Sequence, residues 1–207
     1  MSDMNLSISG TKRLLTMGKY CDKNIVITAS GSGDFMDTYQ KGLETSGYGY
    51  GFAGGGWSDA VYDPPRQISI TRTAGYAFAY SKITNTKVPI IVDTENIYNT
   101  LLFYNADKLK TIPSLKVTDK VTTFTNWFSR CTALEEVNFT ADSVIGASIS
   151  FVDSPKLTNA SVQTVINALK DLTGATSQTL TLHATVGAAL SPEQKAAITA
   201  KNWQLVY

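Results

Sequence analysis

A ten-residue phrase that opens with phenylalanine recurs along the middle of the chain and constrains the fold more than any other feature. It occupies residues 103–112, 128–137 and 151–160, and in each copy the Phe, a Leu six positions later and a final apolar residue keep their places. A weaker copy begins at Phe78, with Ile83 near the Leu position. Neighbouring phenylalanines are 25, 25 and 23 residues apart. A period of about 24 residues is typical of leucine-rich repeats.

The pattern inside one copy explains how such a chain would bury its apolar residues. Within 134–139, Val137 and Phe139 share one face of a short strand because side chains alternate, and Leu134 enters the same core from the preceding turn. Each Phe fills the core from the opposite side. One copy cannot bury its own apolar face, so neighbouring copies must stack. The sequence therefore predicts a short solenoid over residues 66–160, and a coincidental pattern in a single mixed domain is the alternative.

The best-formed copy resembles a known repeat family. Residues 127–137 read Trp-Phe-x-x-Cys-Thr-Ala-Leu-Glu-Glu-Val, which is similar to the BspA-like leucine-rich repeat. The resemblance covers residues 75–158 and is degenerate outside this copy. The copy at Phe151, for example, carries Asp153 and Ser154 in place of Cys131. The resemblance implies a leucine-rich-repeat fold and a role in surface contact.

Residues 161–207 predict a cap of helix, strand, helix and strand. Apolar residues at 162, 165, 166, 169 and 172 have helical spacing, with Ser161 as the N-cap and Gly174 as the stop. Residues 178–183 alternate as a strand. Ser191 and Pro192 start a second helix that runs to about Lys201, and 203–207 form a final strand. Strand, helix and strand favour a parallel crossover, and a solenoid end needs such a cap.

The N-terminal part of the chain predicts two further segments. Residues 1–30 predict a small β-rich attachment module, and residues 31–65 are rich in Gly and aromatic side chains. The phrase Leu-Leu-Thr-x-Gly-Lys-Tyr-Cys-Asp-x-Asn-Ile at 14–25 resembles a short module of tail, baseplate and fibre-type proteins from phages and prophages of Gram-positive gut bacteria. The phrase from Leu180 to Trp203 is similar to the ends of leucine-rich-repeat proteins from the same setting. We thus expect an α/β chain: N-terminal module, solenoid and β-α-β cap.

The candidate binding residues lie in a Gly-rich stretch with interleaved aromatics. They are Tyr48, Tyr50, Phe52 and Trp57, within residues 48–57. Glycine leaves the backbone free while the aromatics offer flat apolar faces with polar tips. Such a loop could stack on sugar rings or pack on a partner chain. The alternative is an interdomain loop whose aromatics fold back on the solenoid.

Composition excludes several classes of function. The chain has 18 Lys and Arg against 17 Asp and Glu, a net charge of +1 that argues against a protein gripping nucleic acid through its phosphates. We see neither a secretory signal nor an apolar run long enough to span a bilayer. Cys21 and Cys131 lack a second Cys at zinc or redox spacing. Two buried thiols are the simpler interpretation, and a disulfide stays open. We expect no metal and no cofactor.

The sequence contains no catalytic signature. The single histidine, His183, is expected on the outer face of a strand, and no nucleophile motif accompanies it. Asp34, Asp37, Asp59 and Asp63 lie in polar segments, where acidic residues are usually solvated. A glycosidase would need two of them about 5–10 Å apart, which a sequence cannot reveal. We therefore expect that the protein is not an enzyme.

These observations define three functional hypotheses. The first is a structural or adhesive component of a phage virion, made in the host cytoplasm and located in a tail, baseplate or fibre. Its partners would be other virion proteins, further copies of itself as a homo-oligomer (a trimer by analogy with fibres), and a host surface glycan or protein. Nucleic acid and membrane are not expected as partners. The second hypothesis is a bacterial BspA-like surface adhesin, and the third is a glycan-active enzyme.

Overall fold

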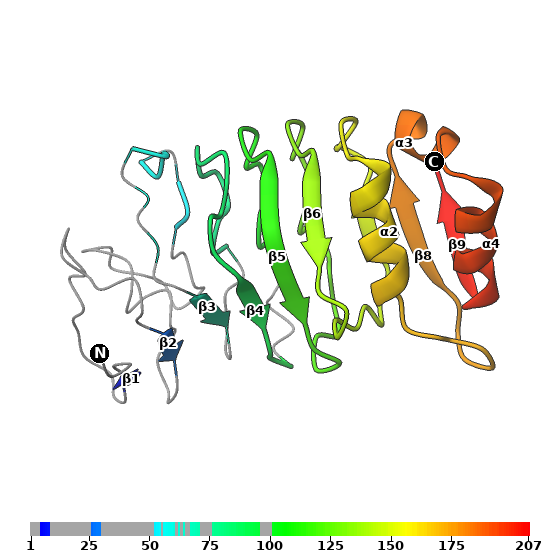
Figure 1. Cartoon of the computed structure of the whole chain (residues 1–207), viewed down its shortest axis with the longest axis horizontal. Coiled ribbons are helices and arrows are strands. Elements are labelled where there is room, and N and C mark those ends of the chain that lie inside the picture. Colours follow the sequence, from blue (N-terminus) through cyan, green and yellow to red (C-terminus); the bar gives the residue numbers. More distant parts are fainter. Residues whose placement is uncertain are drawn as a thin grey trace.

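The computed structural model describes residues 5–8, 26–29, 52–54, 56–60, 62, 64, 67–70, 76–95 and 101–207 of the 207-residue chain. Within these residues the protein has a mixed α/β structure with two parallel sheets and three helices (Figure 1). The strands of the larger sheet follow one another along the long axis, and the helices lie toward the C-terminal end. The mixed α/β class expected from the sequence is confirmed.

The larger sheet contains six strands in chain order, and every neighbouring pair is parallel. Parallel strands cannot be joined by a tight hairpin, so they need longer crossover connections. Ile90 pairs with Leu115 and Val92 with Val117, which aligns the buried positions of neighbouring strands. The strands are β1 (Asn5–Ile8), β2 (Val26–Ala29), β3 (Gln67–Ile70), β4 (Ile90–Val92), β5 (Thr111–Val117) and β6 (Glu136–Phe139).

Five phenylalanine rings stack face to face in one column. Successive ring centroids lie 5.1, 5.2, 5.5 and 4.5 Å apart, with interplanar angles of 21°, 18°, 12° and 23°. None of the rings is more than 1% exposed. Because the spacing is close to the roughly 4.8 Å between neighbouring strands, the column and the sheet advance together. This phenylalanine column consists of Phe52, Phe78, Phe103, Phe128 and Phe151.

The apolar positions of the ten-residue phrase are buried as predicted, with one exception. The leucines of all three copies, Leu109, Leu134 and Leu157, are at most 5% exposed, and Ile112 and Val137 are fully buried. The corresponding residue of the third copy, Ala160, is exposed. The expectation for this residue was wrong because the chain there forms a helix instead of a strand.

That helix, α2 (Asn159–Ala168), covers the free edge of β6. The amide of Val137 donates to Ser161 Oγ at 3.0 Å, and the amide of Phe139 donates to Thr164 Oγ1 at 3.1 Å. The Thr164 hydroxyl proton is directed at the carbonyl oxygens of Val137 (3.1 Å) and Ser161 (2.8 Å). Two side-chain hydroxyls therefore occupy the places that the backbone of a further strand would take.

The ends of α2 differ from the sequence prediction. Its N-cap is Thr158, whose side chain accepts from the amide of Ser161, so Ser161 is a buried residue inside the helix rather than its cap. The helix ends at Ala168, well before Gly174. The backbone becomes extended at Leu169 and forms a parallel bridge with Ile145. Lys201 Nζ donates to the freed carbonyls of Ile166 (2.9 Å), Asn167 (3.1 Å) and Leu169 (2.8 Å). Burial lowers the pKa of Lys201.

The smaller sheet consists of β7 (Ile149–Phe151), β8 (Gln178–Leu182) and β9 (Trp203–Val206), all parallel. The two strands and the parallel pairing predicted for residues 178–207 are confirmed. Helix α4 (Pro192–Ala200) begins as predicted, with Ser191 as N-cap in a capping box with Gln194. A short helix, α3 (Ala184–Ala188), was not predicted, and it packs so closely that a Cβ on Gly187 would lie 2.2 Å from the ring of the C-terminal Tyr207.

The boundaries proposed from the sequence do not coincide with the hydrogen-bonded units. Strands β1 and β2, from the N-terminal module, belong to the same sheet as β3–β6. The phenylalanine column already starts at Phe52, inside the segment 31–65. Strand β7, placed in the segment 66–160, pairs with β8 of the cap. Strand pairing thus spans each of the three expected boundaries, and the division into segments stays a prediction.

The edge contact made by Thr164 yields a first prediction. Thr164→Val keeps the side-chain shape but leaves the amide of Phe139 without its hydroxyl acceptor, so the free energy of unfolding should fall by about 1–3 kcal/mol. Thr164→Ser keeps the hydroxyl and should cost less than about 1 kcal/mol. Urea titrations of the two variants measure the difference. Equal losses would mean that packing, and not the hydroxyl, closes the edge of β6.

Candidate functional site

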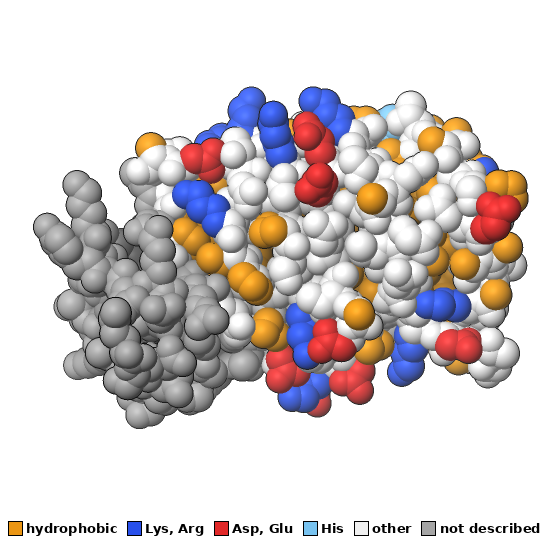
Figure 2. All heavy atoms as spheres, viewed as in Figure 1, with side chains coloured by type: hydrophobic (Ala, Val, Ile, Leu, Met, Phe, Trp, Pro, Cys, Tyr) orange, Lys and Arg blue, Asp and Glu red, His pale blue; other side chains and the backbone are white. Residues whose placement is uncertain are grey.

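The outer face of β4–β6 carries side chains that are not fully buried. Its side chains Ile91, Ser114, Lys116 and Asn138 are half-buried, whereas their strand neighbours point into the core. In Figure 2 the charged side chains gather toward the upper and lower margins of this view, and a mostly uncharged band lies between them. The face therefore offers polar groups and short apolar side chains without a strong field of either sign.

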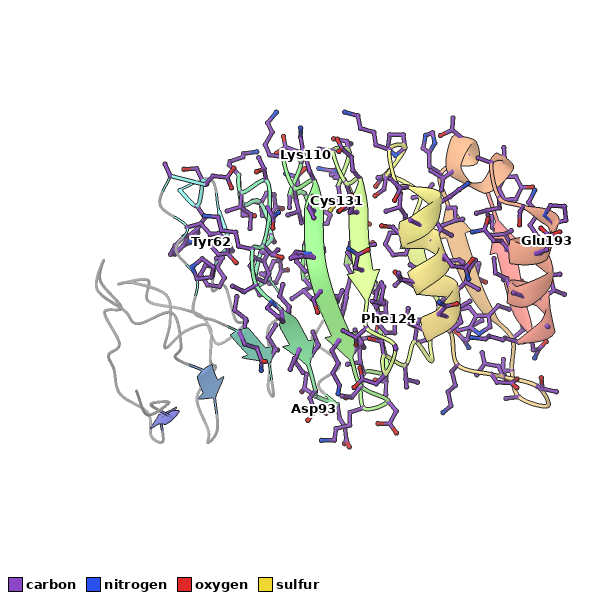
Figure 3. The ribbon with its side chains drawn as sticks, in the orientation of Figure 1. Tyr62, Asp93, Lys110, Phe124, Cys131 and Glu193 are labelled. Atoms are coloured by element: carbon purple, nitrogen blue, oxygen red, sulfur yellow. The ribbon has the colours of Figure 1, made fainter. Side chains whose placement is uncertain are left out.

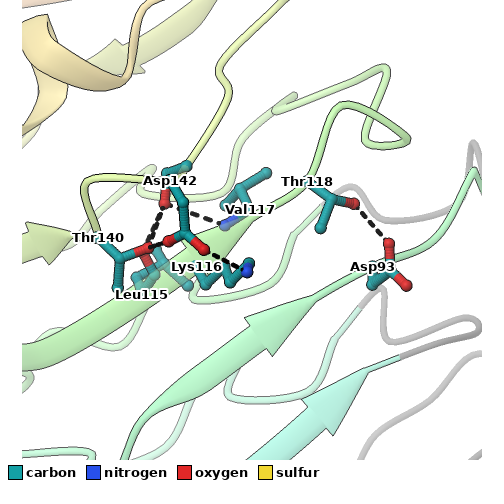
Figure 4. A network of polar contacts seen from close by, with 8 residues as sticks. Asp93, Leu115, Lys116, Val117, Thr118, Thr140 and Asp142 are labelled. Carbon is teal, nitrogen blue, oxygen red and sulfur yellow. Dashed lines mark hydrogen bonds and ion pairs between the residues drawn. The ribbon is translucent and has the colours of Figure 1, made fainter.

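At the ends of β4 and β5, the carboxylates of Asp93 and Asp142 each bond to side chains of a neighbouring segment (Figure 4). Thr118 Oγ1 donates to Asp93 at 2.7 Å and Lys120 lies 3.1 Å from the other oxygen. The Thr118 hydrogen bond, aided by Lys120, lowers the pKa of Asp93. Lys116 pairs with Asp142 and lowers the pKa of that carboxyl. Lowered pKa values suit permanent charges in a structural role, whereas a general acid needs a raised one.

A buried hydroxyl joins the same two segments nearby. Ser143 Oγ accepts from the amide of Val117 at 3.3 Å and donates to the carbonyl of Leu115 at 3.1 Å. Ser143 is 6% exposed, so these bonds form away from water. Like the hydroxyls of α2, this side chain satisfies backbone groups of the neighbouring segment. Ser143, like Ser161 and Thr164, thus makes a contact between neighbouring segments of the chain.

At the opposite margin of the sheet, where the strands begin, carboxylates also bond to side chains of neighbouring segments. Lys82 Nζ lies 2.7 Å from Asp107, 25 residues later, and the Lys82 hydrogen bond lowers the pKa of Asp107. Thr84 donates to Asp59 from its amide (2.9 Å) and its hydroxyl (2.6 Å), which lowers the pKa of Asp59. Figure 3 places Lys110 at this margin and Asp93 at the other. Exposed pairs such as these contribute little stability individually.

Of the four residues predicted as a binding site, the structure describes two, Phe52 and Trp57. Tyr48 and Tyr50 lie outside the described residues. Phe52 is 1% exposed and stacks on Phe78, so the idea that its ring contacts a ligand is corrected: the ring belongs to the core. Trp57 is partly exposed, and its ring meets Phe52 edge-on at 5.1 Å. For these two residues the observed packing matches the alternative in which the aromatics fold back.

A different group of aromatic and basic side chains forms a ridge in the turns before β4, β5 and β6. The rings of Tyr80 and Tyr104 meet edge-on at 5.5 Å, and the Arg130 guanidinium lies 5.5 Å over the Tyr104 ring. Tyr80 is 44% exposed and Arg130 is exposed as well. The Arg130 amide donates to Asp153 at 2.8 Å. We call Tyr80, Tyr104 and Arg130 the turn ridge.

Two residues of the turn ridge have a backbone that rarely suits large side chains. Four positions, each two residues after a phenylalanine of the column, have positive φ: Gly54 (95°), Tyr80 (61°), Asn105 (55°) and Arg130 (60°). Glycine and asparagine accept this conformation readily, whereas other L-residues lose roughly 1–2 kcal/mol in it. Tyr80 and Arg130 are therefore strained where the equivalent residues are not.

Sequence reasoning missed the turn ridge, because the pattern of its residues along the chain is too weak to identify them. Tyr80 and Arg130 follow their phenylalanines by two positions and Tyr104 follows Phe103 by one, so large side chains recur at the edge of the ten-residue phrase. That offset carries no apolar periodicity. Without the backbone conformation, nothing distinguishes these residues from ordinary solvated ones.

His183 and Asp59, which carry groups capable of acid–base chemistry, both make structural hydrogen bonds. His183 is the N-cap of α3, and its Nδ1 accepts from the amide of Thr185 at 3.3 Å. Asp34, Asp37 and Asp63 lie outside the described residues. Across residues 76–95, 101–207 and the shorter described ranges, no three His, Cys, Asp or Glu side chains gather as a metal site would require. In the same ranges no helix is long and apolar enough to cross a bilayer.

Comparison of the chain with protein-family models, with curated proteins and with solved structures gives no match.

Cys131 is a free thiol inside the core, near the start of β6 (Figure 3). Its Sγ lies 3.1 Å from the carbonyl oxygen of Phe103, to which it donates. Burial raises the pKa of Cys131 to about 12. Because the thiolate is the reactive form, this side chain is chemically protected in the folded protein. Cys21 lies outside the described residues.

The protected thiol gives a second prediction. In the Cys21→Ser variant, a chromogenic disulfide reagent at pH 8 should leave Cys131 unmodified in the native protein and modify it fully in denaturant. The rate should follow the free energy of unfolding, because reaction requires opening. Rapid native-state modification that stays unchanged when the protein is stabilised would contradict the assigned burial.

Proposed function

We propose that residues 66–160 form a leucine-rich-repeat solenoid of the BspA-like type, and that residues 161–207 close it. Three features support this proposal. The parallel strands follow chain order. One phenylalanine of the column accompanies each segment of 23–26 residues. Helix α2 then meets the last strand of the sheet with hydroxyl groups. On this proposal Phe52 belongs to a further copy before residue 66.

We infer that the protein is a non-enzymatic contact and display module. The observation that carries this inference is the open outer face of β4–β6, with its uncharged band between two charged margins (Figure 2). A rigid face of this kind suits contact with another subunit or with a host surface. The partners proposed on this basis are other virion proteins and further copies of the chain, as a homo-oligomer for which we propose a trimer.

The virion location has a separate basis. It depends on the resemblance of residues 14–25 to phage tail, baseplate and fibre-type modules. The protein would be made in the host cytoplasm and assembled there. A bacterial surface adhesin is the second candidate, and the fractionation experiment below distinguishes it from a virion protein.

Fractionation of a producing strain tests the location. After induction, particles purified on a density gradient are analysed by quantitative mass spectrometry beside the cell-envelope fraction. We expect peptides of the chain to peak with the tail proteins of the particle. Recovery in the envelope fraction alone would contradict the virion proposal and support the adhesin.

Light scattering of the purified chain should give an oligomer mass, and a monomer would contradict self-association.

A positive charge introduced on the outer face by mutation tests the proposed contact function. Asn138→Arg places a cation on the outer face of β6. We expect it to reduce incorporation into particles or adsorption to host cells by about tenfold or more, because desolvating an added charge at a contact is costly. Thr132→Arg adds the same charge in the exposed turn before β6 and serves as the matched control. Equal behaviour of the two variants and the wild type would exclude the outer face as the contact surface.

A further inference from the structure

We draw no further inference here: the strongest candidate, the outer edge of β9 in the smaller sheet, where Val206 is 49% and Tyr207 is 51% exposed, carries none because nothing in the structure shows what covers it.

Discussion

Stacking between phenylalanine rings of neighbouring segments is the interaction on which the rest of the structure depends. Each segment is too short to enclose its own ring, and the ring becomes fully buried only between those before and after it. Backbone hydrogen bonds join the same neighbouring segments. The amide of Phe78 donates to the carbonyl of Leu102 at 2.8 Å, and the amide of Phe103 donates to the carbonyl of Trp127 at 3.0 Å. Strand register and ring stacking therefore enforce one another.

A structure built by stacking has to end, and hydroxyl side chains make the ending possible. Ser161 and Thr164 meet the last strand of the larger sheet from a helix, and Lys201 holds the final carbonyls of that helix. The edge of β6 is thereby closed to the strand pairing that open edges invite. Ser143 makes the same kind of contact within the stack. Among the described residues, the outer face of β4–β6 and the turn ridge are partly exposed.

The sequence predicted what depends on apolar spacing and missed what depends on the backbone. The burial of Phe103, Phe128 and Phe151 followed from their spacing, as did the capping box at Ser191. Phe52 lies 26 residues before Phe78, yet it was interpreted as a ligand contact because glycines surround it. Ser161 has the composition of an N-cap and instead satisfies a neighbouring strand. The turn ridge depends on φ angles, which residue types do not encode at Tyr80 or Arg130.

A double-mutant cycle tests the central claim most directly. Phe→Leu substitutions are made at the stacked neighbours 103 and 128, and separately at positions 78 and 151, which are not in contact; urea unfolding measures all variants. The account predicts a coupling of about 0.5–1.5 kcal/mol for the neighbours and additive effects for the distant pair. Additive effects at 103 and 128, or an equal coupling in both pairs, would contradict a structure that depends on contacts between neighbouring rings.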